Sequence, residues 1–547
     1  MLKSALALAA LVQLSPQEGD VPAFDPGRRT ATRPAPTAFY DGSARQLAVP
    51  APVAVDVTID IDGRLDDAAW AKASILTGFT QYDPVEGSAA SENTEVRLLV
   101  TDDALYFGIR ADDADGGVRA TLTERDGYSR SDDYVRVVLD TFNDSRRAYV
   151  FMVNPLGIQG DGLWVEGTGR GFGDPIDWNP DFIWQSFGRV DEGGYTAEMR
   201  IPLKSLRFPA LPVQDWGMQI QRTIRRTGYS QSWAPITAER ANRLEQSGSL
   251  QGLEGLDPGL FMEINPTVVG SSQGRYVSER DALVRGSADG EVGLNLTYGL
   301  TSNLTLDGTV NPDFSQIEAD AGQIAVNERF ALFLPEQRPF FLEGTDVFQM
   351  PKRLVYTRSI VNPVGAEKVS GKVGGFQVAY LGAVDEIGGP LDEGGASNPV
   401  VNLIRVKGDI GRSSTMGLVY TDRTEPGAAY NRVAGTDARL VLGGRYTLEL
   451  LAAGSMDGAA GADAAFGSLF SADFRRSGRS FSANASFEDV ADDFRALKGV
   501  LADSEDLQRL IHSPLFGREQ QTKAMAAGEF LASVTRKIAD KDMDVAL

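Results

Sequence analysis

A segment from Val292 to Val310 alternates apolar residues with small or polar ones on both sides of a Thr-Ser-Asn turn. Between Val292 and Leu300, valine, leucine or tyrosine occupies every second position, with glycine, asparagine or threonine between them. Successive side chains of a strand point to opposite faces, so the pattern predicts one apolar face and one small, polar face. Such strands form the walls of membrane β-barrels. A soluble β-sandwich with one face in water gives the same alternation, so this hairpin alone leaves both folds open.

Two kinds of strand meet near residue 260. Before it, short strands bounded by turns are typical of a β-sandwich, and we predict them at 94–100, 104–110, 133–140, 148–154, 195–202 and 216–222. After it the predicted strands are longer and rich in glycine, at 260–270, 291–300, 304–311, 368–384 (two), 399–411, 415–423, 437–456 (two), 464–475 and 479–488. The sequence therefore predicts an all-β protein, with an N-terminal β-sandwich over residues 53–256 and a second antiparallel domain over residues 257–489.

The two ends of the chain differ from these domains. Lys3 and the short apolar run after it have the features of a secretory signal peptide, so we expect export, with the signal over residues 1–20. Residues 21–52 are rich in Pro, Gly, Ser and Arg and are predicted to be a linker. From Val490, apolar residues recur at three- and four-residue steps among charges, which predicts a helical tail over residues 490–547.

Composition excludes several kinds of chemistry. The chain has no cysteine, which excludes disulfides, thiolate nucleophiles and cysteine-ligated zinc. Its single histidine, His512, lies in the tail, so the main body holds neither a Ser-His-Asp triad nor a histidine-ligated zinc. A net charge of −22 repels phosphates, and we predict no nucleic-acid partner.

A series of short motifs runs between residues 55 and 250. Its members are Asp62-Gly63-Arg64-Leu65-Asp66-Asp67-Ala68-Ala69-Trp70, Pro84-Val85-Glu86-Gly87, Thr94-Glu95-Val96-Arg97, Asp140-Thr141-Phe142, Asn154-Pro155-Leu156-Gly157 and Glu198-Met199-Arg200-Ile201-Pro202. In this order the motifs resemble the family 9 carbohydrate-binding domain that begins many bacterial envelope proteins. The resemblance implies a β-sandwich whose partner is a glycan or polysaccharide.

A second group of motifs follows, and its members are Val310-Asn311-Pro312-Asp313-Phe314-Ser315-Gln316-Ile317-Glu318-Ala319-Asp320, Asn327-Glu328-Arg329-Phe330 and Pro335-Glu336-Gln337-Arg338-Pro339-Phe340-Phe341-Leu342-Glu343-Gly344. This group resembles the uncharacterised barrel domain that follows the sugar-binding-like domain in the same proteins. The resemblance implies that residues 257–489 form a β-barrel in the outer membrane of a Gram-negative cell, with outer-membrane lipid as a partner. The family continues with strands where the helical tail begins here, so we expect an incomplete barrel with open edges.

The motif-bearing segment 311–344 is rich in Arg and carboxylates and does not alternate. Its Arg–carboxylate pairs could satisfy one another inside a barrel or at its mouth, with Phe340 and Phe341 anchoring it against the wall. A plug or gate and a packed loop that closes the barrel base are both compatible with this pattern. The tail from Phe494 to Phe516 is similar to a helical part of the ATP synthase delta subunit, and a spliced reading frame explains this as well as natural divergence does.

Glycan binding requires flat aromatic faces on which pyranose rings pack and polar groups that reach their hydroxyls. The candidate ligand-binding residues, in or near a Gly- and Asp-rich stretch, are Trp164, Trp178, Trp184, Asn154 and Asp161. Packing in the core or at an edge is the alternative for these three Trp residues. The Trp residues predicted to fill the core are Trp70, Trp216 and Trp233.

Aspartate clusters are candidate calcium ligands, because Ca²⁺ prefers several carboxylate and carbonyl oxygens. The candidate metal-binding residues are Asp112 and Asp113 with Asp115, and Asp140 with Asp144. Neither set has EF-hand spacing, and solvated acidic turns are the alternative.

The sequence contains no catalytic motif, and we assign no catalytic residue. The predicted function is therefore non-catalytic carbohydrate binding at the bacterial outer membrane. One alternative is an outer-membrane transport or export pore capped by the sandwich. The other is a glycoside hydrolase of carbohydrate catabolism, which requires a carboxylate pair that the sequence does not single out.

Overall fold

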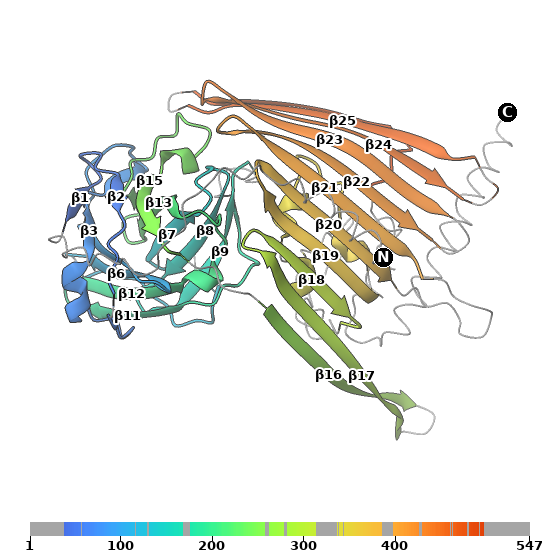
Figure 1. The fold of residues 1–547 in the computed structure, drawn as a ribbon, viewed down its shortest axis with the longest axis horizontal. Helices are drawn as coiled ribbons and strands as arrows, with labels where there is room; N and C mark the ends of the chain where they lie inside the picture. Colours follow the sequence, from blue (N-terminus) through green and yellow to red (C-terminus); the bar gives the residue numbers. More distant parts are fainter. Residues whose placement is uncertain are drawn as a thin grey trace, which may run out of the picture.

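The computed structural model describes residues 38–496, except residues 56, 115, 128–130, 168–174, 257–261, 278–281, 313–335, 337, 343, 361, 386–397, 426–428, 460, 462, 479–480 and 492. Figure 1 shows an N-terminal body of strands beside a broad curved sheet. The predicted all-β fold is confirmed. The predicted signal peptide and most of the predicted tail lie outside the described residues.

The N-terminal body consists of two sheets. The first has six strands in the order β1 (Phe39–Asp41), β3 (Ser74–Thr77), β5 (Thr94–Val100), β6 (Ala104–Asp112), β12 (Gly194–Pro202) and β11 (Gln185–Asp191). The second has the order β10 (Ile176–Asp177), β9 (Gln159–Val165), β8 (Arg147–Val153), β7 (Tyr134–Asp140), β13 (Val213–Ile224), β14 (Tyr229–Ser232) and β4 (Thr80–Asp83), and β15 (Gly248–Glu254) pairs with β13 and β2 (Ala48–Pro50). Short helices lie between the strands at η1 (Ala68–Lys72), η2 (Leu203–Ser205) and η3 (Leu244–Gln246).

The predicted linker ends earlier than expected, because its last residues form strands of the sandwich. Residues 38–52 contain β1 and β2, which pair in parallel with β3 and β15. The local composition gave no sign of this, because each strand is only three residues long and depends on a distant partner. The β-sandwich itself was predicted correctly.

Apolar residues from both sheets form one core, as strand alternation requires. Trp70, Trp216 and Trp233 are buried, which confirms their prediction as core residues. The Trp70 indole N–H donates to Glu198 Oε1 at 3.0 Å, and the same carboxylate accepts from the backbone N–H groups of Asp62 and Gly63. The first and last motifs of the N-terminal series therefore hold each other in place.

The second domain is an eleven-stranded antiparallel sheet in which every strand pairs with its neighbours in the sequence. Its strands are β16 (Met262–Val277), β17 (Ala282–Thr301), β18 (Leu304–Val310), β19 (Pro363–Val373), β20 (Phe376–Asp385), β21 (Val400–Ile410), β22 (Ser414–Thr424), β23 (Tyr430–Leu442), β24 (Tyr446–Gly458), β25 (Ala465–Arg476) and β26 (Ala483–Val490). The end strands β16 and β26 do not pair with each other within the described part of the chain. Because β26 ends at Val490, the strands reach the point where the tail was predicted to begin.

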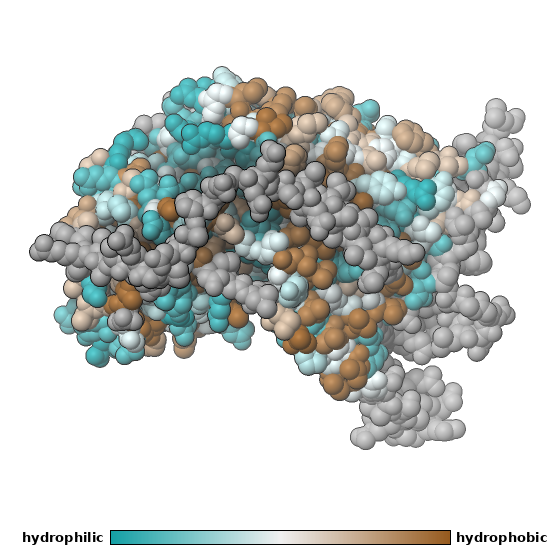
Figure 2. Space-filling view, in the orientation of Figure 1, coloured by the Kyte–Doolittle hydropathy of each residue, from teal (hydrophilic) through white to brown (hydrophobic). Residues whose placement is uncertain are grey.

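The two faces of this sheet have opposite chemistry. Leu418 is 60% exposed, and the apolar side chains that share its face in β17, β22 and β25 are exposed as well: Val292, Leu294, Met416, Tyr420, Phe466, Phe470 and Phe474. The opposite face buries polar and charged residues: Thr305, Asp307, Thr309, Lys368, Ser370, Arg405, Thr421, Asp437, Thr447, Ser455 and Ser471. Figure 2 shows apolar residues gathered over the part of the surface that this sheet forms.

A segment from residue 338 to residue 360 covers the polar face with α3 (Pro339–Leu342), η5 (Thr345–Phe348) and η6 (Thr357–Ser359). Phe340 and Phe341 are buried against Ala366, Leu381 and Leu403, as their predicted anchoring role requires. Arg338 pairs with Glu336 at 2.8 Å and donates to the carbonyls of Thr357 and Ile360. No helix of the described chain has the length and apolar character needed to cross a membrane.

Candidate glycan-binding site

Two of the three candidate tryptophans are core residues. Trp164 packs with Val138, Ala148 and Val150, and its indole N–H donates to Glu166 at 3.2 Å. Trp184 lies edge-on against Phe151, with 5.4 Å between the ring centroids. Both rings are buried and offer no free face to a sugar, so their assignment as ligand-binding residues is corrected. Their Gly- and Asp-rich surroundings suggested a loop, but Trp164 belongs to β9.

Trp178 is placed differently, because it directly follows β10 and is 39% exposed. The Arg136 guanidinium carbon lies 6.0 Å from the centroid of the Trp178 ring. The same guanidinium lies 5.4 Å from the centroid of Tyr134. Cations at such distances are attracted to aromatic faces, so Arg136 holds the two rings close together.

Tyr134, Arg136, Trp178, Gln221 and Arg225 form what we call the aromatic–arginine cluster. Tyr134 and Arg136 share one face of β7, opposite the core residues between and beyond them. Gln221 is the cross-strand neighbour of Arg136 on β13, and Arg136 Nη1 donates to its Oε1 at 3.1 Å. Arg136 Nη2 lies 3.4 Å from the Tyr134 hydroxyl, and the Arg225 guanidinium lies 5.4 Å from the Tyr134 centroid.

This cluster combines the groups that sugar recognition uses: two aromatic rings, two guanidinium groups and an amide. Sequence reasoning missed Tyr134, Arg136, Gln221 and Arg225. One signal could have pointed to them, because Arg136 interrupts an otherwise apolar strand two residues after Tyr134. Its pairing with Gln221 spans 85 residues, however, and only the fold brings the two together.

The polar candidates Asn154 and Asp161 are buried and fully engaged in local structure. Asn154 Oδ1 accepts from the backbone N–H groups of Leu156 and Ile158, and its Nδ2 donates to the Thr121 carbonyl. Asp161 accepts from Arg125, the Phe182 backbone N–H and the Trp184 indole. These two side chains fix turns and loops, so their assignment to ligand binding is corrected.

Asp161 also belongs to a carboxylate group that the sequence did not reveal. Ligand oxygens of Asp126, Asp161 and Asp181 all lie within 4.8 Å of one another. Arg125 lies among them, with its nitrogens 3.7, 2.6 and 3.6 Å from the three carboxylates in that order. Burial raises the pKa of Asp126 to about 6, although the hydrogen bond from the Asp161 backbone N–H opposes this shift. The guanidinium already supplies the positive charge that a metal ion would bring here.

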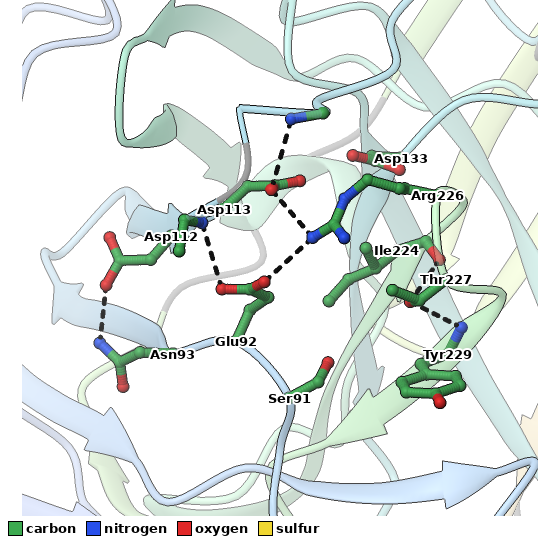
Figure 3. Close-up of polar contacts among 12 residues, drawn as sticks. Ser91, Glu92, Asn93, Asp112, Asp113, Asp133, Ile224, Arg226, Thr227 and Tyr229 are labelled. Carbon is green, nitrogen blue, oxygen red and sulfur yellow. Dashed lines mark hydrogen bonds and ion pairs between the residues drawn. The ribbon is translucent and has the colours of Figure 1, made fainter.

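The two predicted sets of calcium ligands lie in different sheets, and each is engaged by a protein cation. Asp112 ends β6 in the first sheet, whereas Asp140 ends β7 in the second. Asp113 and Glu92 each lie 3.0 Å from Arg226 Nη2, and Asn93 donates to Asp112 at 3.2 Å (Figure 3).

The Asp140 carboxylate is used by its own turn, where it accepts from the Ser145 backbone N–H at 2.7 Å. Asp144 forms an ion pair with Lys372. Asp113 pairs with Arg226 and Asp144 with Lys372, so each predicted set already contains a protein cation, and Asp115 lies outside the described residues.

A separate open groove of about 570 Å³ lies where β1, β2 and the start of β15 meet. Its lining residues include Phe39, Tyr40, Leu47 and Gly248. None of the aromatic–arginine cluster lines this groove, so the two are distinct features of the sandwich.

The comparisons with known proteins agree with this division of the chain. Residues 61–247 match the family described as carbohydrate family 9 binding domain-like, and residues 274–372 match a domain of unknown function, DUF5916. In sequence, the chain is 48% identical over 46 residues to ATP synthase subunit delta of Azorhizobium caulinodans, covering 8% of this chain and 25% of that protein. The chain thus spans about a quarter of that relative.

Three solved structures also match. A family 9 carbohydrate-binding module from Caldicellulosiruptor kristjanssonii, solved with cellotriose, is 15% identical with a TM-score of 0.26, over 38% of this chain and 92% of that one. A candidate carbohydrate-binding protein from Bacteroides uniformis is 16% identical with a TM-score of 0.30, over 38% and 97%. The outer membrane protein OmpT of Vibrio cholerae, lacking loop L8, is 10% identical with a TM-score of 0.19, over 43% and 95%.

The family match and the two-sheet fold cover the same part of the chain and include both motifs that meet at Glu198. The chain therefore carries a carbohydrate-binding domain of the family 9 type near its N-terminus, followed by a further β domain.

Proposed function

We propose that this protein binds a glycan or polysaccharide, without catalysis, at the bacterial outer membrane. The observation that carries glycan binding is the aromatic–arginine cluster, which lies within the matched family 9-type domain. Trp178 is 39% exposed. Arg136 and Gln221 lie beneath it as buried polar groups, and the Arg225 guanidinium lies against Tyr134 in the same cluster. A sugar ring packed on Trp178 would use both kinds of group, which is how carbohydrate sites combine affinity with specificity.

The eleven-stranded sheet supports the proposed membrane location, because its apolar face is exposed and its opposite face buries polar and charged residues. In a soluble sandwich a strongly apolar face would be buried, but here it is exposed, and the opposite face buries charged residues such as Lys368, Arg405 and Asp437 beside apolar ones. Lipid is the surrounding that suits such an apolar face, while the polar face is covered from within by residues 338–360. This arrangement favours the barrel over the soluble sandwich, the two folds that the alternation had left open.

The dimensions of the apolar face fit a bilayer. The ten residue steps from Tyr446 to Met456 on β24 span about 33 Å along a strand, which a tilt of about 45° reduces to roughly 23 Å. Outer-membrane barrels carry an apolar band of about 25 Å bordered by aromatic residues. Phe376 and Tyr446 lie next to short turns, and Tyr420 and Phe466 lie toward the opposite ends of their strands.

The experiment that tests glycan binding is a panel of purified oligosaccharides and polysaccharides, cellotriose among them, titrated into the full chain in detergent by calorimetry. We expect at least one saturable ligand, and we expect Trp178→Ala to weaken its binding at least tenfold. Phe187→Ala is the matched control, since Phe187 is a similarly exposed aromatic residue on β11 that also lies beside an arginine. Binding that withstands Trp178→Ala but is lost in the control would refute the assigned site.

A transport or export pore is the second candidate, and the buried charges of the sheet's polar face favour it. Arg405 pairs with Asp437, and Arg439 lies 3.5 Å from Glu449 on this face. Charged side chains inside a barrel commonly line a water-filled path. Ion conductance across planar bilayers, increased by deleting residues 338–360, would support the pore over a purely binding function.

A further inference from the structure

The connections of the eleven-stranded sheet differ between its two ends. At one end they are residues 302–303, 374–375, 411–413, 443–445 and 477–482, so none exceeds six residues. At the other end three connections, residues 278–281, 425–429 and 459–464, contain four to six residues, but residues 386–399 form one of 14 and residues 311–362 one of 52. Gly374, Gly411 and Gly443 have positive φ angles of 59°, 57° and 56°, which lets the chain reverse tightly at the short-turn end.

The sandwich is joined to the short-turn end through the hairpin between β7 and β8. Arg146 Nε lies 2.8 Å from Asp409, and its Nη2 donates to the carbonyls of Gly411 and Ser414 at 3.0 and 2.8 Å. Lys372, just before the β19–β20 turn, pairs with Asp144 and lies 3.0 Å from Asp409. Two cations and two carboxylates therefore alternate across this contact, and most of their side chains are shielded from solvent.

A second set of contacts reaches the turn at residues 443–445 and adds a bond to the turn at residues 411–413. The Ala241 backbone N–H donates to the Gly444 carbonyl at 2.7 Å, and Arg445 pairs with Glu239. Ser413 donates to Glu245. Burial raises the pKa of the Glu166 carboxyl, and the charge of nearby Arg439 opposes this shift. Three neighbouring turns of the sheet thus contact one side of the sandwich (Figure 1).

In bacterial outer-membrane barrels, the short turns face the periplasm and the longer loops face the outside. We infer that the sandwich lies on the periplasmic side of the outer membrane and holds its glycan there, an inference that rests on the proposed membrane location. The chain path agrees with it, because only residues 255–261 separate β15, the last strand of the sandwich, from β16, which starts at the same end of the sheet.

This placement restricts the ligand. A cell-surface polysaccharide cannot reach the aromatic–arginine cluster from outside the cell, whereas a periplasmic glycan can. Two sources present the same pyranose chemistry there: the glycan strands of the cell wall and oligosaccharides that have crossed the outer membrane. Sedimentation of the purified protein with isolated cell-wall sacculi identifies the first source, and calorimetry with soluble oligosaccharides identifies the second.

The sidedness can be tested with single cysteines, because the chain has none of its own. Ala210→Cys places a thiol on an exposed loop of the sandwich, and Ala464→Cys places one in an exposed connection at the opposite end of the sheet. A membrane-impermeant maleimide is applied to intact cells and to cells with a permeabilised outer membrane. We expect Ala464→Cys to react in intact cells and Ala210→Cys to react only after permeabilisation.

Two results would overturn the inference, and they differ from each other. Reaction of Ala210→Cys in intact cells, with the protein in the outer-membrane fraction, would show that the sandwich faces outward while leaving the membrane location in place. Recovery of the unmodified chain in the soluble periplasmic fraction would instead reject the membrane location on which the inference rests.

Discussion

Arg146 of the sandwich and Asp409 of the eleven-stranded sheet form an ion pair of 2.8 Å in which the arginine side chain is 7% exposed and the aspartate side chain 18%. We expect Arg146→Ala to lower the free energy of unfolding by about 2 kcal/mol, because Asp409 keeps only Lys372 as its cation and the carbonyls of Gly411 and Ser414 lose their donor. The loss should also separate the melting of the two domains in calorimetry. Arg64→Ala is the control, since Arg64 forms an exposed pair with Asp62 at 3.8 Å, and such pairs contribute less than about 1 kcal/mol. Equal effects of the two variants would contradict the coupling role of Arg146.

Tyr134 allows ring packing to be separated from hydrogen bonding at the glycan cluster. Tyr134→Phe keeps the ring beneath Arg136 and Arg225 but removes the hydroxyl, so we expect ligand affinity to change less than about threefold. Tyr134→Ala removes the ring and should weaken binding by about tenfold or more, equivalent to about 1.4 kcal/mol. Calorimetry with a ligand from the glycan panel measures both variants. A large loss in Tyr134→Phe would show that the hydroxyl, and not the ring, carries recognition.

The carboxylate group around Arg125 should make sandwich stability depend on pH. Burial raises the pKa of Asp126 to about 6 from its ordinary 3.8, so the folded protein keeps a proton that the unfolded chain releases. Its stabilising contribution is full below about pH 4 and is lost as the pH rises through about 6. Between about pH 4 and pH 6, the free energy of unfolding of the wild type should therefore fall by about 1 kcal/mol relative to that of Asp126→Asn. This value allows for solvent screening at the partly exposed side chain.

Denaturant unfolding at several pH values measures this difference, and Asp191 supplies a control of opposite sign. A hydrogen bond from Arg110 lowers the pKa of Asp191 in the folded protein. The stabilising contribution of ionised Asp191 is therefore present above the ordinary aspartate pKa and is lost as the pH falls through the lowered pKa. Parallel pH profiles for wild type and Asp126→Asn would reject the raised pKa of Asp126.

Leu418 distinguishes a lipid-facing sheet from a water-facing one. We expect Leu418→Arg to cost about 2–4 kcal/mol of stability in a bilayer if this face contacts hydrocarbon near the midplane. In water the same change at an exposed leucine would be nearly neutral. Leu211→Arg, at an exposed leucine of the sandwich, is the control and should have little effect. Folding into lipid vesicles, followed by denaturant titration, measures both variants, and an unchanged Leu418→Arg protein would count against lipid contact.

Alternation alone located the strands of the second domain. The predicted strand 415–423 is β22 (Ser414–Thr424), and the predicted pair within 437–456 corresponds to the adjoining parts of β23 and β24. These elements follow from local sequence because the period of two is built into every strand, and glycine or polar turns mark the ends. The motif around Trp70 also identified the sandwich before its contacts were known.

The candidate site could not be found in the same way. One stretch of sequence contains Trp164, Trp178 and Trp184, yet of these three only Trp178 is exposed. Trp164 packs against residues of β7 and β8, and Trp184 packs in the sandwich core. The neighbours that complete the cluster come from β7 and β13, and no local pattern records their pairing. The side chains of Asn154 and Asp161 likewise accept hydrogen bonds from backbone N–H groups of nearby turns and loops, and local sequence did not distinguish this role from ligand binding.

By itself, the sequence determined that the chain forms strands, where most of them run, and that a sandwich precedes a longer-stranded sheet, since these features depend on neighbours within a few residues. Only the tertiary structure decided which face of the sheet is exposed, which tryptophan is free and which end of the sheet holds the sandwich. The reason is physical: alternation is the same whichever face turns outward, and burial depends on residues brought together from distant parts of the chain.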